Sequence, residues 1–594
     1  MSQARLLGLR RSILESSTKK VNLTINGFPI KVPAGTTIAD AARSIQVLIP
    51  RLCSLQTHDH HGSCQVCVVE VRGENALKTA CDTPVGEGMV VETNSPKARR
   101  TRRMLVELML ASHPGDCNTC DCVRTCELRG LATSAGIRTR YFEQKSKEGF
   151  VPDTSHPSVA LDPNKCVLCG RCVHICRDIQ LVEALGFVNR GGQTRVASPF
   201  TGGLGESPCV GCGQCILACP VGALHEQHDL DQIWRLLSNS DKTVIAQVHP
   251  ASQVSLGEEF DLKPGTPVSG RIVAALRRLG FQWVFNTSFA ADLVSVEVGH
   301  ELARRIRKNG PLPLISSCSP GLVKFMEHFF PDLLPNLSVC KSPQQAFGAL
   351  AKTWFADKKK ISARNLAVVS ITPCTAMKFE AQRPEMRTGK GFDVDYVMTN
   401  RELGRLIHEA GIDFCSLPEE DFDTPMSATS GAGVLFGATG GIMEATLRVI
   451  YGILGEPVPK APQFEELRGL ADIKKAKFHL WGRDVAVGVA SGLANCRRLL
   501  DSVRNGNPEG FAFLELMGCP SGCAGGGGQS TGSTFEVRSM RTSSIYLEEQ
   551  RKTLRQPLDN PAVQAVYDEF LLDPDSKKCR EILHTRYCPR SKLW

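Results

Sequence analysis

Eight cysteines in two runs of identical spacing constrain this 594-residue chain more than any other feature. Each run reads C-x2-C-x2-C-x3-C, and the second run is followed directly by Pro220. Thiolates three residues apart on a turning backbone can reach three irons of one cubane, and the fourth cysteine can reach a second cubane. The two runs are Cys166, Cys169, Cys172 and Cys176, then Cys209, Cys212, Cys215 and Cys219.

This spacing, which is that of two-cluster bacterial ferredoxins, predicts two [4Fe–4S] clusters that exchange their fourth ligands. Two zinc sites are the alternative, but zinc sites usually show two separated C-x2-C pairs. We expect an insertion between Cys176 and Cys209, where the chain is longer than a minimal ferredoxin needs. One cluster is assigned to Cys166, Cys169, Cys172 and Cys219, and the other to Cys209, Cys212, Cys215 and Cys176.

Composition narrows the class of protein. Apolar residues make up 42% of the chain and charged residues 22%, which is typical of globular domains. The net charge of +9 comes without any motif of a nucleic-acid-binding module, so we expect no nucleic-acid partner. We expect no membrane span either, because no apolar run is long enough. The 25 clustered cysteines indicate metal ligation in a reducing compartment.

A hairpin and a helix precede a second group of cysteines. Apolar residues alternate over 21–32 on both sides of Asn26-Gly27, and a helix with a capping box at Asp40 is expected from Thr37. Cysteines follow with the spacing C-x10-C-x2-C-x13-C, which predicts a β-grasp [2Fe–2S] domain over 21–97. The spacing departs from that of plant ferredoxins. We assign the ligands to Cys53, Cys64, Cys67 and Cys81. His58, His60 and His61 are interpreted as loop residues because four cysteines suffice.

This cysteine pattern, after a hairpin and a helix, resembles the domain that opens the large iron–sulfur subunit of respiratory complex I and the larger iron hydrogenases. A basic helix over about 96–112 then leads into H-x3-C-x2-C-x5-C, which is similar to the histidine-ligated [4Fe–4S] site of those families. One imidazole in place of a thiolate should raise the cluster's potential. Cys122 could replace a ligand, although its spacing fits less well. The ligands are assigned to His113, Cys117, Cys120 and Cys126 in a domain over 98–150, before the ferredoxin domain over 151–228.

From residue 229 onward, short continuous apolar runs alternate with amphipathic stretches. This texture predicts parallel sheets covered on both faces by helices, with ligands at the carboxyl ends of the strands. The fold class is therefore α+β multidomain, ending in a large α/β domain over 229–594. Cys318, Cys374, Cys519 and Cys523 each follow such a run. The expected strands are 243–248, 282–285, 314–315, 366–371, 485–490 and 511–516.

The motifs of this domain resemble those of the [FeFe]-hydrogenases over almost the whole chain. The matching segments are NTSFAADL (286–293), CKSPQ (340–344), SGAGVLFGATGGIMEA (430–445), both cysteine loops and LHTRY (583–587). The resemblance implies a C-terminal tail like the small subunit of that family. It also implies an H-cluster, in which a [4Fe–4S] cluster is joined to a diiron unit that carries CO, cyanide and a dithiolate.

The resemblance also assigns roles to residues. Cys374, Cys519 and bridging Cys523 hold the cofactor, with Ser319 at the fourth ligand position. Pro250 and Met517 lie beside the diiron unit, and Lys378 is the lysine nearest to the position that binds cyanide. Protons pass outward through Cys318, Glu301 and Ser338. The implied reaction is 2H⁺ + 2e⁻ ⇌ H₂.

Several residues depart from the family pattern. Ser319 stands where a cysteine ligates, and an alkoxide binds iron less softly than a thiolate. Met377 occupies the position of the cyanide-binding lysine, and Val298 the position of the first relay glutamate. His249 precedes Pro250 where the family has a small residue, and Thr372 replaces a methionine.

Two functions therefore stay open. The first is an oxygen-sensitive iron-only hydrogenase, fed by reduced ferredoxin or by an NADH-oxidising flavoprotein and loaded by maturation enzymes. The second is an impaired, hydrogenase-like electron carrier, redox sensor or assembly scaffold. The basic, serine-containing segment over 1–20 resembles a mitochondrial-type presequence, which suggests a hydrogenosome or mitochondrion-related organelle. A frayed N-terminus of a cytoplasmic protein is the alternative.

Overall fold

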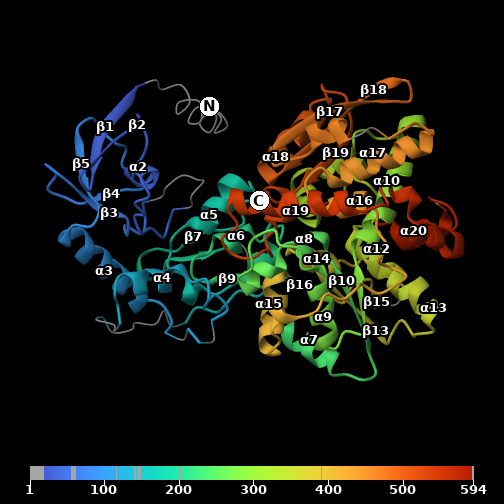
Figure 1. The fold of residues 1–594 in the computed structure, drawn as a ribbon, viewed down its shortest axis with the longest axis horizontal. Helices are drawn as coiled ribbons and strands as arrows, with labels where there is room; N and C mark the ends of the chain where they lie inside the picture. Colours follow the sequence, from blue (N-terminus) through green and yellow to red (C-terminus); the bar gives the residue numbers. More distant parts are fainter. Residues whose placement is uncertain are drawn as a thin grey trace.

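The computed structural model describes residues 19–54, 62–115, 117–118, 120–138, 142, 149–200, 202–389, 391–458, 461–574 and 576–590, without the side chains of 461–463. Of the presequence expected over 1–20, residues 1–18 lie outside them, as do His58, His60 and His61, whereas Lys20 belongs to the first strand of the N-terminal sheet. Figure 1 shows a smaller N-terminal lobe beside a large body, with the elements of the predicted ferredoxin between them.

The N-terminal sheet begins with the predicted hairpin. Strands β1 (Lys20–Ile25) and β2 (Phe28–Pro33) turn at Asn26 and Gly27, whose φ angles of 49° and 84° are those of a two-residue hairpin loop. The sheet order is β2-β1-β5-β3-β4, and helix α2 (Ile38–Ser44) is capped by Thr37. The other strands are β3 (Val68–Val71), β4 (Lys78–Thr79) and β5 (Met89–Glu92).

Two helices join this sheet to the next module. Arg102 of α3 (Pro96–Ala111) is buried and donates to the carbonyls of Val68 and Thr93, which fixes the helix against the sheet. Glu127, at the start of α4 (Glu127–Ser134), accepts two hydrogen bonds from Arg171 of α5 (Arg171–His174). The three N-terminal modules are thus linked by arginines.

The ferredoxin module pairs β6 (Val159–Leu161) with β9 (Leu224–Glu226) and includes α6 (Gln214–Ala218). The insertion expected after Cys176 is present as a hairpin of β7 (Gly186–Val188) and β8 (Arg195–Ala197).

The large domain contains two four-stranded sheets. In the first, β11 (Trp283–Asn286), β10 (Thr243–Val248), β13 (Leu366–Ile371) and β16 (Tyr396–Met398) are all parallel. The second has the order β12 (Leu314–Ile315), β19 (Phe511–Met517), β18 (Arg483–Ser491) and β17 (Ile473–Leu480). Strand β17 runs antiparallel to β18, so the prediction of parallel sheets holds except at this edge.

Helices pack around these sheets (Figure 1). The longest, α10 (Ser288–Arg307), is buried along most of its length and packs against α12 and α17. Other helices are α7 (Leu230–Leu237), α8 (Pro250–Gln253), α9 (Ser269–Leu279), α11 (Pro320–Phe329), α12 (Pro343–Leu350), α13 (Ala356–Lys359), α14 (Ala376–Ala381), α15 (Asn400–Glu409), α16 (Gly431–Val434), α17 (Gly441–Leu454), α18 (Leu493–Arg504), α19 (Phe535–Arg551), α20 (Pro561–Val566) and α21 (Lys577–Leu583).

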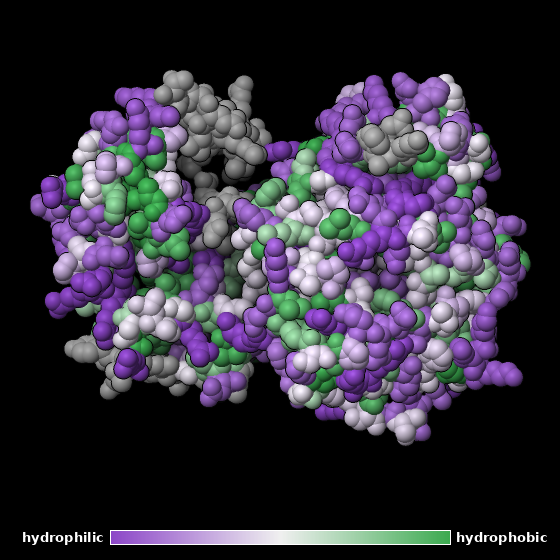
Figure 2. Space-filling view, viewed as in Figure 1, coloured by the Kyte–Doolittle hydropathy of each residue, from purple (hydrophilic) through white to green (hydrophobic). Residues whose placement is uncertain are grey.

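The visible face of the large domain is mainly hydrophilic, with hydrophobic side chains scattered over it (Figure 2). Among the described residues, no helix is both long enough and apolar enough to cross a membrane.

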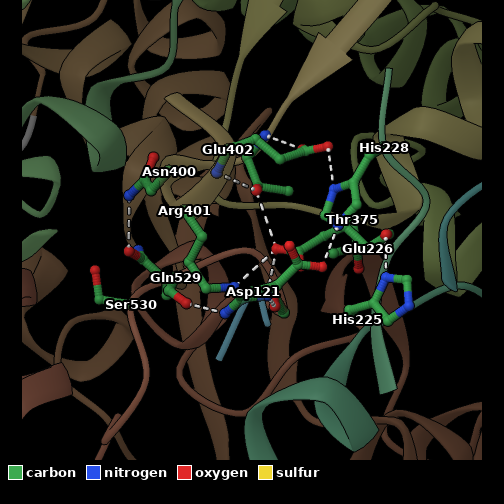
Figure 3. Close-up of polar contacts among 12 residues, drawn as sticks. Asp121, His225, Glu226, His228, Thr375, Asn400, Arg401, Glu402, Gln529 and Ser530 are labelled. Carbon is green, nitrogen blue, oxygen red and sulfur yellow. Dashed lines mark hydrogen bonds and ion pairs between the residues drawn. The ribbon is translucent and has the colours of Figure 1, made fainter. Parts of the chain in front are cut away.

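Three modules meet at a polar network around His228 (Figure 3). His228 Nε2 lies 3.0 Å from Asp121 of the histidine-ligated module, and its Nδ1 lies 3.4 Å from Glu402 of α15. Arg405 pairs with the other oxygen of Asp121 at 3.0 Å. Arg401 joins Glu226 of β9 to the carbonyl of Gly527 in the glycine-rich cysteine loop. The network therefore connects the accessory modules to the last cysteine loop.

Because both of its ring nitrogens face carboxylates, His228 is suited to carry a positive charge. Burial opposes that charge, but the hydrogen bonds to Asp121 and Glu402 raise the pKa of His228 from 6.5 to about 9. A raised pKa stabilises the fold fully below pH 6.5, and the contribution is lost as the pH rises through about 9.

We expect His228→Gln to lower the free energy of unfolding at pH 6.5 by up to about 3 kcal/mol. The same substitution should change it little at pH 9.5. Anaerobic calorimetry of both proteins across this range measures the difference. His479→Gln, which changes an imidazole that is exposed beside Asp484, is the matched control. An equal loss of stability for His228→Gln at both pH values would contradict this assignment.

Candidate functional site

The first four cysteines gather in one buried group. Cys53 forms side-chain hydrogen bonds with Cys64 and Cys81, and Cys81 forms one with Cys67. All four are at most 7% exposed. The hydrogen bond from Cys81 outweighs burial and lowers the pKa of Cys67 to about 7. The same contacts lower the pKa of Cys53 but raise those of Cys64 and Cys81, so protons are shared unequally within the group. Four buried thiols gathered in this way could hold a two-iron centre.

The next group differs from its prediction in one detail. His113 is buried two residues after the end of α3, and Cys126 is the N-cap residue of α4. Cys122 forms a side-chain hydrogen bond with Cys126, which lowers the pKa of Cys126 to about 6. Cys117 is exposed and Cys120 is half-buried. The structure thus brings Cys122, which the spacing favoured less, next to a predicted ligand.

The eight ferredoxin cysteines line two small cavities. Each cavity takes three cysteines from one run and the fourth from the other, as the crossed pattern requires. Burial raises the pKa of Cys169 and Cys212 to about 12, so these thiols ionise readily only when a metal binds them. The first cavity is lined by Cys166, Cys169, Cys172 and Cys219, and the second by Cys176, Cys209, Cys212 and Cys215.

Three cysteines of the large domain meet from distant loops. Cys374 follows β13, whereas Cys519 and Cys523 follow β19. Burial raises the pKa of Cys523 well above its usual range. The neighbouring thiols raise it further, and Cys374 has the largest effect among them. Cys519 Sγ lies 3.9 Å from the carbonyl of Cys212, at the edge of the second ferredoxin cavity. The thiol group and that cavity are therefore adjacent.

The glycines after Cys523 make this approach possible. A Cβ atom on Gly527 would lie 2.2 Å from the carbonyl oxygen of Cys212, and one on Gly526 would lie 2.3 Å from that of Pro373. Both distances are far shorter than a van der Waals contact. Glycine is therefore required where this loop passes between the ferredoxin module and the β13 loop.

Ser319 faces the same loop. Its hydroxyl oxygen accepts a hydrogen bond from the backbone N–H of Gly518 at 3.1 Å, one residue before Cys519. Cys318, its neighbour, is 3% exposed, and burial raises the pKa of its thiol to about 12.

The predicted proton relay is only partly assembled. Ser338 donates to Glu301 at 2.7 Å, and Arg305 donates to the same carboxylate at 2.6 Å. Val298 is buried on the preceding turn of α10 and offers no polar atom. Glu297 turns elsewhere, since it accepts from Tyr567 at 2.5 Å and lies 3.2 Å from His584.

Lys378 is engaged in two ion pairs. Its ammonium lies 2.9 Å from Glu402 and 3.7 Å from Asp229, and its cofactor-binding role stays a prediction. The preceding residue, Met377, is buried, and its sulfur accepts from the Thr372 hydroxyl at 3.1 Å.

An apolar group borders the thiols on the side of β10. Met517 and Cys523 pack with Ala251 and Val254, and Pro250 begins α8. His249, directly before Pro250, has a side-chain nitrogen that is buried without a partner among the described residues. In the sequence, His249 stands out only as a departure from the family pattern. The signal for a role is a polar residue directly after a mainly apolar strand.

The converging thiols, the glycine loop and an unpaired buried donor fit an iron–sulfur cofactor such as the expected H-cluster.

Comparison with known proteins gives matches to iron–sulfur and hydrogenase domains along the chain. The description "Iron only hydrogenase large subunit, C-terminal domain" matches residues 242–527, and "Iron hydrogenase small subunit" matches 535–590. "2Fe-2S iron-sulfur cluster binding domain" matches 18–96. Iron–sulfur regions of NADH-ubiquinone and NADH-quinone oxidoreductases match 102–140 and 156–225.

Several relatives are similar over most of their length. "NADP-reducing hydrogenase subunit HndD" of Solidesulfovibrio fructosivorans is 43% identical, covering 96% of this chain and 100% of the relative. "Iron hydrogenase 1" of Clostridium pasteurianum is 35% identical, covering 95% and 99%. A more distant relative, "Cytosolic iron-sulfur assembly component 3" of Mus musculus, is 28% identical, covering 67% and 86%.

A solved structure shows the same fold. The apo [FeFe]-hydrogenase HydA1 from Chlamydomonas reinhardtii is 35% identical and aligns with a TM-score of 0.55, covering 61% of this chain and 98% of that structure. The chain belongs to the iron-only hydrogenase family.

Proposed function

We propose that this chain catalyses 2H⁺ + 2e⁻ ⇌ H₂ at a centre held by the thiols of the large domain. The observation that carries the proposal is the meeting of Cys374, Cys519 and Cys523 beside the cavity that Cys212 lines. Electrons delivered to that cavity reach the thiol group without crossing a further layer of protein.

The cofactors follow from the ligand groups. We assign one [2Fe–2S] cluster, a histidine-ligated [4Fe–4S] cluster and two ferredoxin cubanes to the three N-terminal modules, with the domain limits stated above. Cys374, Cys519 and Cys523 would hold an H-cluster, with Ser319 at the remaining position. That group supplies the redox-active iron at which protons and electrons combine.

The partners follow from the modules. The matches to NADH oxidoreductase regions, and the relative named as NADP-reducing, support electron exchange with an NADH-oxidising flavoprotein; ferredoxin is the other candidate. Maturation enzymes would insert the diiron unit. An organelle related to the hydrogenosome or mitochondrion is proposed from the N-terminal segment.

In this proposal, proton transfer to and from the centre limits the rate of the enzyme. Glu301 and Ser338 are paired for a relay that begins at Cys318, but Val298 leaves it without the first carboxylate. We therefore propose slow turnover. The alternative is a hydrogenase-like electron carrier, redox sensor or assembly scaffold, which Ser319, Met377 and Val298 favour, together with the relative named as an assembly component.

Anaerobic expression with the maturation enzymes separates the two functions. We expect infrared bands of CO and cyanide, and H₂ evolution from reduced viologen at a low rate. A protein that contains iron but shows neither bands nor gas would favour the second function.

Restoring the missing carboxylate tests the relay. We expect Val298→Glu, combined with Met377→Lys, to raise the H₂ evolution rate on the order of 10²-fold, since a positioned acid–base group contributes about that much. Val298→Gln with Met377→Lys is the matched control, because an amide cannot pass protons in the same way. Equal rates for the two double variants would remove the relay assignment.

The vacant ligand position gives a separate prediction. Ser319→Cys should slow the loss of iron from the large-domain cluster, because thiolate binds iron better than a hydroxyl group. Iron content is followed over time in the presence of a chelator. Ser316→Cys serves as the control, because it adds a thiol to the same loop at a different position. The native Ser316 hydroxyl faces the N–H of Cys318. Unchanged retention in Ser319→Cys would show that the position is not a ligand.

A further inference from the structure

The protonation of His249 is fixed by its backbone surroundings. The N–H of Ala251 donates to His249 Nδ1 at 3.0 Å, and a backbone N–H can act only as a donor. Nδ1 must therefore accept with its lone pair. Burial also lowers the pKa of His249 to about 3, so the ring is neutral and its single proton lies on Nε2.

That Nε2–H group is a donor without an acceptor. The residue is 1% exposed, and Nε2 has no hydrogen-bond partner among the described residues. Buried polar groups in folded proteins are nearly always paired, because leaving one unpaired forfeits its hydrogen bonds to water. The arrangement therefore requires an acceptor that the described polypeptide does not supply.

A second buried histidine provides a comparison for His249. His156 is also buried, and its Nδ1 accepts from the N–H of Ser158 at 3.0 Å. Its Nε2, however, lies 3.1 Å from the Nζ atom of Lys324. The Nε2–H of His156 can donate to Lys324 when that amine is neutral, and burial lowers the pKa of Lys324 to about 8. The two histidines thus share one backbone arrangement but differ at Nε2, since that of His249 has no hydrogen-bond partner among the described residues.

The position of His249 indicates where the acceptor lies. The residue directly follows β10, and its N–H donates to the carbonyl of Ile371 at the end of β13, three residues before Cys374. Its ring packs 4.8 Å from that of Phe436. The following residues begin α8, where Ala251 packs with Met517 and Cys523. Ligands of such sheets bind at this carboxyl edge.

The site also lacks its expected donor. Met377 stands at the lysine position of the family and has no N–H or O–H in its side chain, while Lys378 is paired with Glu402. We propose that His249 Nε2–H donates a hydrogen bond to an anionic ligand of the metal unit at this site, of the cyanide class, as a positioning residue in place of that lysine. This inference rests on the proposed function.

The test is infrared spectroscopy of the loaded protein. The native chain, His249→Phe, His249→Gln and the control His156→Phe are loaded anaerobically with the diiron unit, and their cyanide and CO bands are compared in H₂O and D₂O. We expect His249→Phe to shift the cyanide bands and to abolish their sensitivity to D₂O. His249→Gln keeps an N–H donor near the same place and should retain both properties, as should His156→Phe.

Each outcome decides the proposal. Cyanide bands in His249→Phe that match those of the native protein would overturn it and would assign the Nε2–H to the face of Phe436. If His249→Phe fails to retain the unit, retention by His249→Gln supports the proposal, and equal failure of both variants overturns it. Absence of all bands from the native protein would instead refute the proposed function, and this inference with it.

Discussion

Sulfur atoms from remote parts of the chain must meet inside the protein, and the rest of the architecture depends on this constraint. The thiols of Cys374 and Cys519 have pKa values raised to about 12 by burial, so each is a poor thiolate by itself. Binding to iron removes those protons and compensates for the burial. The parallel sheets provide the framework, because the carboxyl ends of β12, β13 and β19 carry the cysteine and serine loops to one place.

The modules are joined in a way that keeps the ligand groups close to one another. Cys122 lies against Gly222 of the ferredoxin module, and Cys519 lies against the Cys212 carbonyl. His228 and Arg401 link the modules through charged hydrogen bonds (Figure 3). Arg171 does the same through Glu127. The glycine-rich loop is held by Arg401 and passes so close to Cys212 that no side chain fits there.

Much of this organisation could be predicted from spacing and periodicity. The hairpin at Asn26-Gly27 and the strands before Cys374 and Cys519 depend on short-range rules, and the structure contains them. A fixed cysteine spacing predicts the crossed grouping, in which the cysteines line the two ferredoxin cavities, and their role as ligands stays a prediction. Strand β17 was not predicted, because its alternating lysines make an exposed antiparallel edge rather than a continuous apolar run. The direction of the Lys378 side chain depends on Glu402, which lies 24 residues away, so no local pattern could reveal it. The unpaired nitrogen of His249 likewise becomes visible only once its surroundings are known.

The central claim is that these thiols hold iron, and the iron and sulfide content of anaerobically purified protein tests it most directly. Mössbauer spectroscopy of the same sample identifies the cluster types. We expect a brown protein with both two-iron and cubane signals. Colourless protein without iron, or protein with zinc in place of iron, would contradict it.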